Sequence, residues 1–202
     1  FFRKLPVMFR TAPDDALIPP RPQGEQGSLP DAASLDRLLA NADPVQIVRV
    51  AREVIGRDGL AVVSSFGTES AVLLKLVSDV DPAIPVLLLD TGWLFPETLA
   101  YRDALIAKLG LNDVRAITPD PNKVEQRDPN ADLWSTDPDA CCALRKVEPL
   151  ADALAPFAAW MNGRKRYQGG QRTHIPVGEQ DGPRLKFNPL ARVAPADVLA
   201  IA

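Results

Sequence analysis

The chain has 202 residues, of which 46% are hydrophobic and 24% are charged, enough for one domain with a sizeable core but not for two. Its 23 basic and 26 acidic residues give a net charge of −3, which argues against a sequence-independent nucleic-acid binder, because contact with phosphates needs a basic excess. The two cysteines, Cys141 and Cys142, are adjacent and cannot join distant segments, so a disulfide-stabilised secreted scaffold is excluded.

The start of the chain shows no targeting or membrane signal. Residues 1–4 lack the apolar core of a signal peptide, and no apolar run approaches the roughly 18 residues that a membrane-spanning helix needs. Residues 1–31 contain six prolines and no sustained periodicity, which predicts an extended or partly disordered arm. We therefore expect a cytoplasmic protein whose folded domain spans residues 32–202.

Helices and strands then alternate along the chain. Helical spacing begins at 34–39, and Asp43-Pro44 places a cap and a proline before a second helix that ends near Gly56. Strands are predicted at 60–64, 86–90, 114–118 and 159–162, and helices at 69–80, 96–109 and 137–155. Residues 119–136 are predicted as a long loop and 163–184 as a functional loop. This order is typical of an α/β protein, a parallel sheet flanked by helices.

Three segments that follow strands are candidate ligand loops, because ligands bind beyond the carboxyl ends of parallel strands. The first, 64–70, combines hydroxyls, a glycine and the start of a helix, which suits an anion. Its candidate residues are Ser64, Ser65, Gly67, Thr68, Glu69 and Ser70. A tight turn with a hydroxyl cap explains the same pattern equally well from the sequence alone.

The second segment is Asp90, Thr91 and Gly92, where a strand ends before a helix that starts with proline. Locally, these are as typical of a turn as of a ligand contact. The convergence of two such loops on one sheet edge favours a nucleotide pocket.

The third segment, 162–172, is basic and rich in glycine within an acidic chain, and its candidate residues are Gly163, Arg164, Arg166 and Arg172. Arginine can bind phosphate or sulfate through two hydrogen bonds, although a solvated charge run is the usual explanation for such a stretch. The only histidine, His174, is more typical of a solvated side chain and is assigned no role.

The cysteine pair stands in Cys-Cys-Ala-Leu-Arg-Lys. Taken alone, such a pair is more often structural or incidental than metal-binding, and two thiolates fall short of the four that an iron–sulfur cluster needs.

Together these segments resemble the assimilatory sulfonucleotide reductases, which reduce adenylyl sulfate or phosphoadenylyl sulfate. The resemblance covers about residues 45–200, and its most specific parts are 65–70, 89–92 with 95–98, 163–166 and 186–190. It implies an adenine-nucleotide α-hydrolase-like fold. It also implies that the first loop binds the phosphosulfate end of the nucleotide, that Asp90–Gly92 lines the same pocket, and that the third loop closes over the sulfate.

The cysteine pair resembles the branch that contains a 4Fe-4S cluster and generally prefers adenylyl sulfate. The resemblance implies that Cys141 and Cys142 bind two of the irons, and that Lys146 supports catalysis by linking the cluster to the substrate. Arg164, Arg172 and Lys146 would neutralise the sulfate. A cysteine thiolate would attack the sulfur, AMP would leave, and thioredoxin would release sulfite from the resulting thiosulfonate.

The sequence also departs from the family. A second Cys-x-x-Cys pair and the nucleophilic cysteine near a Glu-Cys-Gly motif do not occur in these residues. We expect the natural protein to continue beyond Ala202, so that this chain binds nucleotide without turnover, with its cluster incomplete or lost. The oligomeric state is open, with a homo-oligomer among the options.

Three alternatives stay open. A phosphoadenylyl-sulfate reductase shares most of the motifs. A nucleotide-binding subunit without a catalytic tail would explain the missing cysteines. An ATP-pyrophosphatase shares the broad fold, but its loop usually reads Ser-Gly-Gly-x-Asp-Ser, whereas Phe66 and Glu69 stand here at the second and fifth positions.

Overall fold

The computed structural model describes residues 30–201, with side chains to residue 198, so the predicted arm lies almost wholly outside the described residues. Helix α1 (Ala32–Leu38) begins where the Asp31 carboxylate accepts a hydrogen bond from the Ser34 amide at 2.8 Å. Helix α2 (Pro44–Ile55) begins at the predicted cap, where Asp43 and Gln46 exchange backbone and side-chain hydrogen bonds. The first two helices of the described residues therefore each begin at an aspartate cap.

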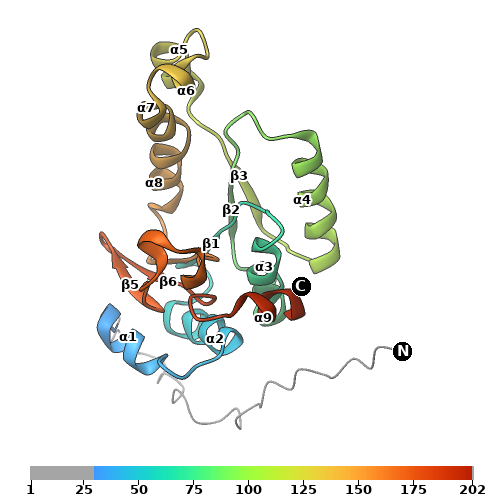
Figure 1. Ribbon diagram of the computed structural model, residues 1–202, viewed down its shortest axis with the longest axis vertical. Coiled ribbons are helices and arrows are strands. Elements are labelled where there is room, and N and C mark those ends of the chain that lie inside the picture. The colour runs from blue at the N-terminus through green and yellow to red at the C-terminus, as the bar shows by residue number, and fades with distance from the viewer. Residues whose placement is uncertain (1–29, 202) are drawn as a thin grey trace.

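One sheet organises the molecule (Figure 1). Its strands are β1 (Leu60–Val63), β2 (Val86–Leu89), β3 (Val114–Ile117), β4 (Ala159–Met161), β5 (Gly178–Asp181) and β6 (Arg184–Phe187). They lie in the order β3-β2-β1-β4-β6-β5, and all neighbouring pairs are parallel except β5 with β6. The predicted parallel α/β architecture is confirmed, with one antiparallel strand at an edge.

Seven further helices follow α1 and α2 in the described residues. They are α3 (Ser70–Val80), α4 (Pro96–Leu109), α5 (Pro121–Arg127), α6 (Leu133–Thr136), α7 (Pro138–Cys142), α8 (Glu148–Leu154) and α9 (Pro195–Ile201). A π-helical turn, η1 (Ala143–Val147), joins α7 to α8, and two 3-10 turns, η2 (Arg166–Gln168) and η3 (Gly170–Arg172), follow β4. Within residues 30–201, no helix has both the length and the apolar character needed to cross a bilayer.

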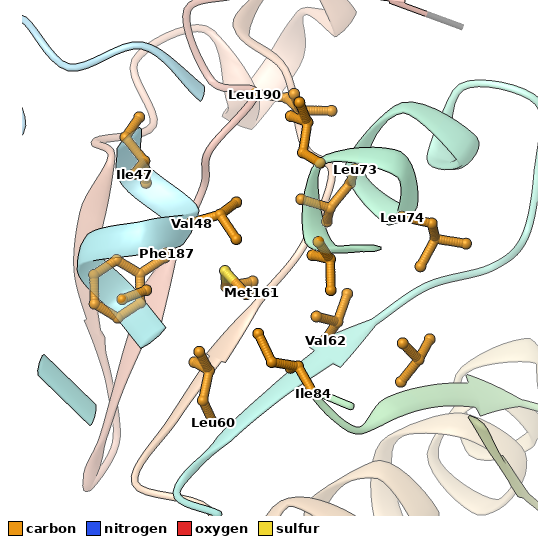
Figure 2. Close-up of a cluster of buried hydrophobic side chains, with 14 of the residues drawn as sticks. Ile47, Val48, Leu60, Val62, Leu73, Leu74, Ile84, Met161, Phe187 and Leu190 are labelled. Atoms are coloured by element: carbon orange, nitrogen blue, oxygen red, sulfur yellow. The ribbon is translucent and has the colours of Figure 1, made fainter. Parts of the chain in front are cut away.

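The central strands β1, β2 and β4 are buried on both faces, as is usual in parallel sheets, whereas the edge strand β3 is half-exposed. On one face Leu60, Val62 and Met161 pack with side chains of α2 and α3, including Val48 and Leu73 (Figure 2). Residues one position along the same strands point the other way. Ala61, Leu87 and Trp160 pack there with Leu154 of α8 and with Phe157. The alternation along each strand therefore supplies two separate apolar cores.

The strand order contains a switch point. From β1 the chain passes to β2 and β3 on one side and returns to β4 on the other. The loops that leave the carboxyl ends of β1 and β4 therefore diverge from neighbouring strands, and such a position is where open α/β sheets bind ligands. The first and third candidate loops of the sequence leave from these two strands.

Two element predictions were wrong, and a third was incomplete. Residues 119–136 contain α5 and α6; α5 begins at Asp120-Pro121, where the Asp120 carboxylate accepts from the Asn122 amide. The second half of 163–184 forms β5 and the start of β6, joined at Gly182, which has a φ of +58°. The single helix expected over 137–155 is divided by the π turn.

Candidate functional site at the carboxyl edge of the sheet

The loop after β1 has a constrained backbone. Phe66 has a φ of +53°, a conformation unfavourable for a bulky residue, and its side chain is 1% exposed. The buried Ser64 hydroxyl accepts a hydrogen bond from the Phe66 amide at 3.1 Å. The core thus holds the Phe66 ring while Ser64 holds its backbone, and strain of this kind concentrates at functional sites.

The remaining residues of this loop face solvent or border it. Ser65, Gly67, Thr68 and Glu69 are exposed, and the hydroxyls of Ser65 and Ser70 lie 3.2 Å apart. Helix α3 begins at Ser70 without a side-chain cap. The first amides of α3 therefore point towards the loop, and the positive end of the helix dipole lies there as well. Both features favour the binding of an anion.

The turn after β2 is also preorganised. The Asp90 carboxylate accepts from the Gly92 amide at 2.9 Å, and Gly92 has a φ of +81° that favours glycine. Asp90 therefore shapes the turn directly, and Thr91 and Gly92 follow at the sheet edge beside the first loop. The prediction that Asp90 acts as a turn residue is confirmed. A ligand contact by Thr91 or Gly92 stays a prediction.

The loops after β1 and β4 are joined by a cluster that the sequence did not predict. The Glu69 Oε2 atom accepts from Lys165 Nζ at 2.9 Å, from the Tyr167 hydroxyl at 3.1 Å and from Gln168 Nε2 at 3.2 Å. The Lys165 side chain is 2% exposed, whereas that of Glu69 is 50% exposed. The buried ammonium group of Lys165 thus holds the Glu69 carboxylate in place between the two loops that leave the switch point.

The cluster also shifts the pKa values of its members. The hydrogen bond from Lys165 is the largest influence on Glu69 and holds its pKa below the ordinary value of 4.5. Burial, together with the Glu69 carboxylate, raises the pKa of Tyr167. Glu69 is therefore charged and Tyr167 protonated at neutral pH, so Tyr167 donates to the carboxylate.

A test of this cluster follows from the lowered pKa of Glu69. Its stabilising contribution is present above the pKa of the unfolded chain and is lost as the pH falls through the lower pKa of the folded state. We expect the free energy of unfolding to decrease below about pH 4.5, and to decrease less in Glu69→Gln. Urea unfolding between about pH 6 and 3 measures this slope, and exposed Glu97→Gln should keep the wild-type slope.

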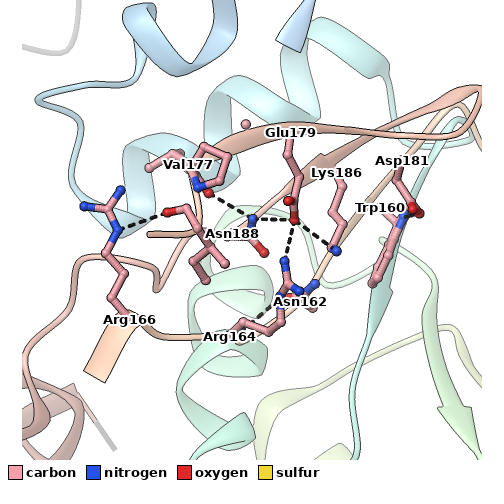
Figure 3. Close-up of polar contacts among 12 residues, drawn as sticks. Trp160, Asn162, Arg164, Arg166, Val177, Glu179, Asp181, Lys186 and Asn188 are labelled. Atoms are coloured by element: carbon pink, nitrogen blue, oxygen red, sulfur yellow. Dashed lines mark hydrogen bonds and ion pairs between the residues drawn. The ribbon is translucent and has the colours of Figure 1, made fainter. Parts of the chain in front are cut away.

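Two of the predicted anion-binding arginines have partners inside the protein. Arg164 forms an ion pair with Glu179, which also accepts from Lys186 and Asn188 (Figure 3). Arg166 donates from Nε to the Ile175 carbonyl at 3.0 Å. These arginines hold the loop against β5 and β6, so neutralisation of a bound sulfate by Arg164, the role that the resemblance implied, has no support in this geometry.

Arg172 lies differently. It is exposed, and its NH1 atom donates to Gln168 Oε1 over a long distance of 3.3 Å. Gly163 is half-buried and packs near Leu73 and Leu190. Of the predicted arginines, Arg172 is therefore the one whose charge is available at the surface of the third loop. His174 is exposed, as expected.

The cysteines lie at the end of α7 and are not joined to each other. Cys141 is buried and Cys142 is exposed, and both are free thiols. Two soft sulfur donors suit iron, but the described residues contain no group of three or more histidine, cysteine or acidic side chains that could hold a metal ion. The chain therefore offers half of a four-thiolate set. Lys146 is exposed on η1.

Two hollows in the described part of the chain are lined by residues outside these loops. One of about 240 Å³ is bordered by the α1–α2 connection, Pro189 and Arg192. Another, of about 260 Å³, lies at the end of β3 and is lined by Thr118, Lys123 and Leu144. Neither is lined by a predicted site residue.

The mostly parallel sheet with its switch point, flanked by helices, defines this chain as an α/β protein with an adenine-nucleotide α-hydrolase-like fold. Solved structures agree at the level of the fold. Phosphoadenylyl-sulfate reductase from Candida auris has a TM-score of 0.68 at 22% identity, covering 84% of this chain and 83% of that one. NH3-dependent NAD synthetase from Campylobacter jejuni has a TM-score of 0.52 at 14% identity, covering 86% and 72%.

Comparisons of sequence identify the family of this chain within that fold class. The phosphoadenosine phosphosulfate reductase domain matches residues 59–201, so the chain belongs to this reductase family. Adenosine 5′-phosphosulfate reductase of Mesorhizobium japonicum is 46% identical over 187 residues, 90% of this chain and 73% of the relative. The enzyme of the same name from Chelativorans is 51% identical over 142 residues, 70% of this chain and 58% of the relative. The predicted family, its oxidoreductase class and its link to sulfate assimilation are confirmed.

Proposed function

We propose that this chain binds adenylyl sulfate at the carboxyl edge of the sheet and supplies the nucleotide site of a thioredoxin-dependent reductase that yields sulfite and AMP. The observation that carries the proposal is the Glu69–Lys165 contact, which joins the loops after β1 and β4 across the switch point. These loops are the ones in which the family motifs lie. The two relatives with the highest identities quoted above are named as reductases of adenosine 5′-phosphosulfate, which is adenylyl sulfate.

The roles that we assign follow from exposure and partners. The backbone amides of Thr68 and Glu69 and the start of α3 bind the anionic phosphosulfate. Thr91 and Gly92 line the pocket beside them. Arg172 and Lys146, both exposed, supply positive charge to the sulfate. Lys165, Arg164 and Arg166 act indirectly, since their internal contacts hold the third loop in place.

The cysteine pair has a separate role in this proposal. Cys141 and Cys142 would each hold one iron of a 4Fe-4S cluster. Thiolates are the ligands that such clusters require, and the pair shows no disulfide or other competing bond. Thioredoxin as reductant, a cytoplasmic location and a homo-oligomeric state remain predictions.

The Arg172→Ala variant tests the site. A hydrogen bond to a charged group contributes about 1.5–3 kcal/mol, so we expect adenylyl-sulfate affinity to fall roughly 10- to 150-fold, measured by isothermal titration calorimetry. Arg37→Ala, an exposed arginine on α1, should leave the affinity unchanged. Equal affinity in the wild type and Arg172→Ala would refute the assignment of Arg172.

Phosphoadenylyl sulfate is the second candidate substrate. Relatives named phosphoadenosine 5′-phosphosulfate reductase include that of Gloeobacter violaceus, 41% identical over 137 residues, 66% of this chain and 57% of the relative. The same titration with phosphoadenylyl sulfate separates the two substrates. Tighter binding of adenylyl sulfate supports our choice, and tighter binding of phosphoadenylyl sulfate overturns it.

A further inference from the structure

Arg145 contacts three segments that are far apart in the sequence. Its NH2 atom lies 2.6 Å from Asp128 Oδ2, its guanidinium carbon lies 3.9 Å from the centre of the Trp93 ring, and its NH1 atom lies 3.5 Å from the Thr91 carbonyl oxygen. The Arg145 side chain is 7% exposed and that of Asp128 is 0% exposed. One buried cation therefore connects the cysteine-bearing segment with the candidate nucleotide turn.

Asp128 holds the guanidinium group of Arg145 and is itself held by a backbone amide. Its Oδ2 atom binds Arg145, while its Oδ1 atom accepts from the amide of Leu133, the first residue of α6, at 3.0 Å. The arginine holds the carboxylate of Asp128 in its charged form by lowering its pKa. Buried ion pairs contribute little net stability compared with apolar packing, so the main effect of this pair is the fixed geometry of the guanidinium group.

The backbone around Arg145 is unusual as well. Arg145 lies in the π turn η1, three residues after Cys142, and both Leu144 and Arg145 are buried. Isolated π turns inside α-helices are frequent at functional sites. The Nε atom of Arg145 is buried and has no hydrogen-bond partner among the described residues. Such an arrangement costs free energy and is unnecessary if the segment only has to complete a helix.

Trp93 completes the connection. It is 46% exposed, yet its ring stacks on the guanidinium group, which is planar and suited to such contact. Trp93 directly follows Gly92, whose positive φ shapes the turn. The orientation of the turn at residues 91–93 therefore depends on a side chain from the segment that carries the cysteines.

We propose that Arg145, held by Asp128, is a positioning residue that sets the geometry of the Thr91–Gly92–Trp93 turn for nucleotide binding. This inference rests on the proposed function, because it assumes that the turn contacts the nucleotide. Lys146, the neighbour on which the sequence resemblance focused, has no contact of this kind among the described residues. Binding of nucleotide at the turn and the placement of the cysteine segment are then linked through one side chain.

A double-mutant cycle tests this role, with AMP as the ligand and isothermal titration calorimetry as the readout. Trp93→Leu and Asp128→Asn should each weaken AMP binding at least about fivefold, and together no more than the stronger single change, because both act through Arg145. In an Arg145→Met background, neither should have a further effect. Where Arg145→Met does not fold, Arg145→Lys replaces it, since lysine keeps the charge but lacks the planar fork.

Arg115 provides the matched control. It also combines an ion pair, with Asp113, and a ring contact, with Phe157, but it lies on β3 away from the loops of the switch point. Arg115→Met should leave AMP affinity unchanged. A purely structural role of Arg145 predicts lower stability with unchanged AMP affinity or strictly additive effects, and either result overturns the inference.

The two proposals fail in different ways. Where Arg172→Ala weakens binding but Trp93→Leu, Asp128→Asn and Arg145→Met do not, the proposed function stands and the role of Arg145 is refuted. Where the wild-type protein binds neither AMP nor adenylyl sulfate, the proposed function fails, and the role of Arg145 fails with it.

Discussion

Replacing Phe66 with alanine is expected to lower the free energy of unfolding by about 3–5 kcal/mol, the usual cost of deleting a fully buried aromatic side chain. The ring is 1% exposed and belongs to the core cluster that includes Leu73 and Met161. The same ring fixes a backbone with a φ of +53° in the first loop. We therefore expect nucleotide affinity to fall in the fraction that remains folded.

Urea unfolding followed by circular dichroism measures the stability effect, and calorimetric titration with AMP measures the binding effect. Phe95→Ala is the matched control, because the Phe95 side chain is 74% exposed and its removal should change stability by no more than about 0.5 kcal/mol. Stable Phe66→Ala protein with full nucleotide affinity would show that the buried ring does not organise the loop.

Cys141→Ser is expected to have the largest effect on the iron and sulfide content of the protein. Serine keeps the size of the side chain but replaces a soft thiolate donor with a poor ligand for iron. In protein expressed from the complete reading frame and purified without oxygen, we expect wild-type protein to contain iron and sulfide, and Cys141→Ser to lose nearly all of both. Iron and sulfide quantitation and the visible absorption spectrum measure the loss.

Ala143→Ser is the control for this experiment, because it adds a hydroxyl one position beyond the cysteine pair without removing a thiol. It should retain iron at the wild-type level. Equal iron content in wild type and Cys141→Ser, or no iron in either, would contradict the assignment of the pair to a cluster.

The strand positions and most helices could be predicted because their signals are local. Buried strands are short apolar runs, and Asp43-Pro44 marks α2 through a cap that the structure contains. Asp120-Pro121 carries the same signal and α5 begins there, but the polar segment around it is also typical of a loop. The β5–β6 hairpin has a weak strand signal, because β5 reads Gly-Glu-Gln-Asp, and its clearest local signal is the turn at Asp181-Gly182.

The site was less predictable, because its key contacts join residues far apart in the sequence. Lys165 stands in a basic run of a kind that is usually solvated, yet it is buried and bound to Glu69, 96 positions earlier. Arg145 pairs with Asp128 across 17 positions and with the Thr91 carbonyl across 54. Local pattern shows which residues carry charge, but burial and partners decide which of those charges remain available to a ligand.

Sulfite formation is the measurement that tests the central claim most directly. The protein expressed from the complete reading frame is incubated with adenylyl sulfate and reduced thioredoxin, and sulfite and AMP are quantified. The account predicts equal amounts of both products, with a strong decrease in Arg172→Ala and none in Arg37→Ala. Absence of sulfite together with pyrophosphate release from ATP would contradict it and would favour the ATP-pyrophosphatase alternative.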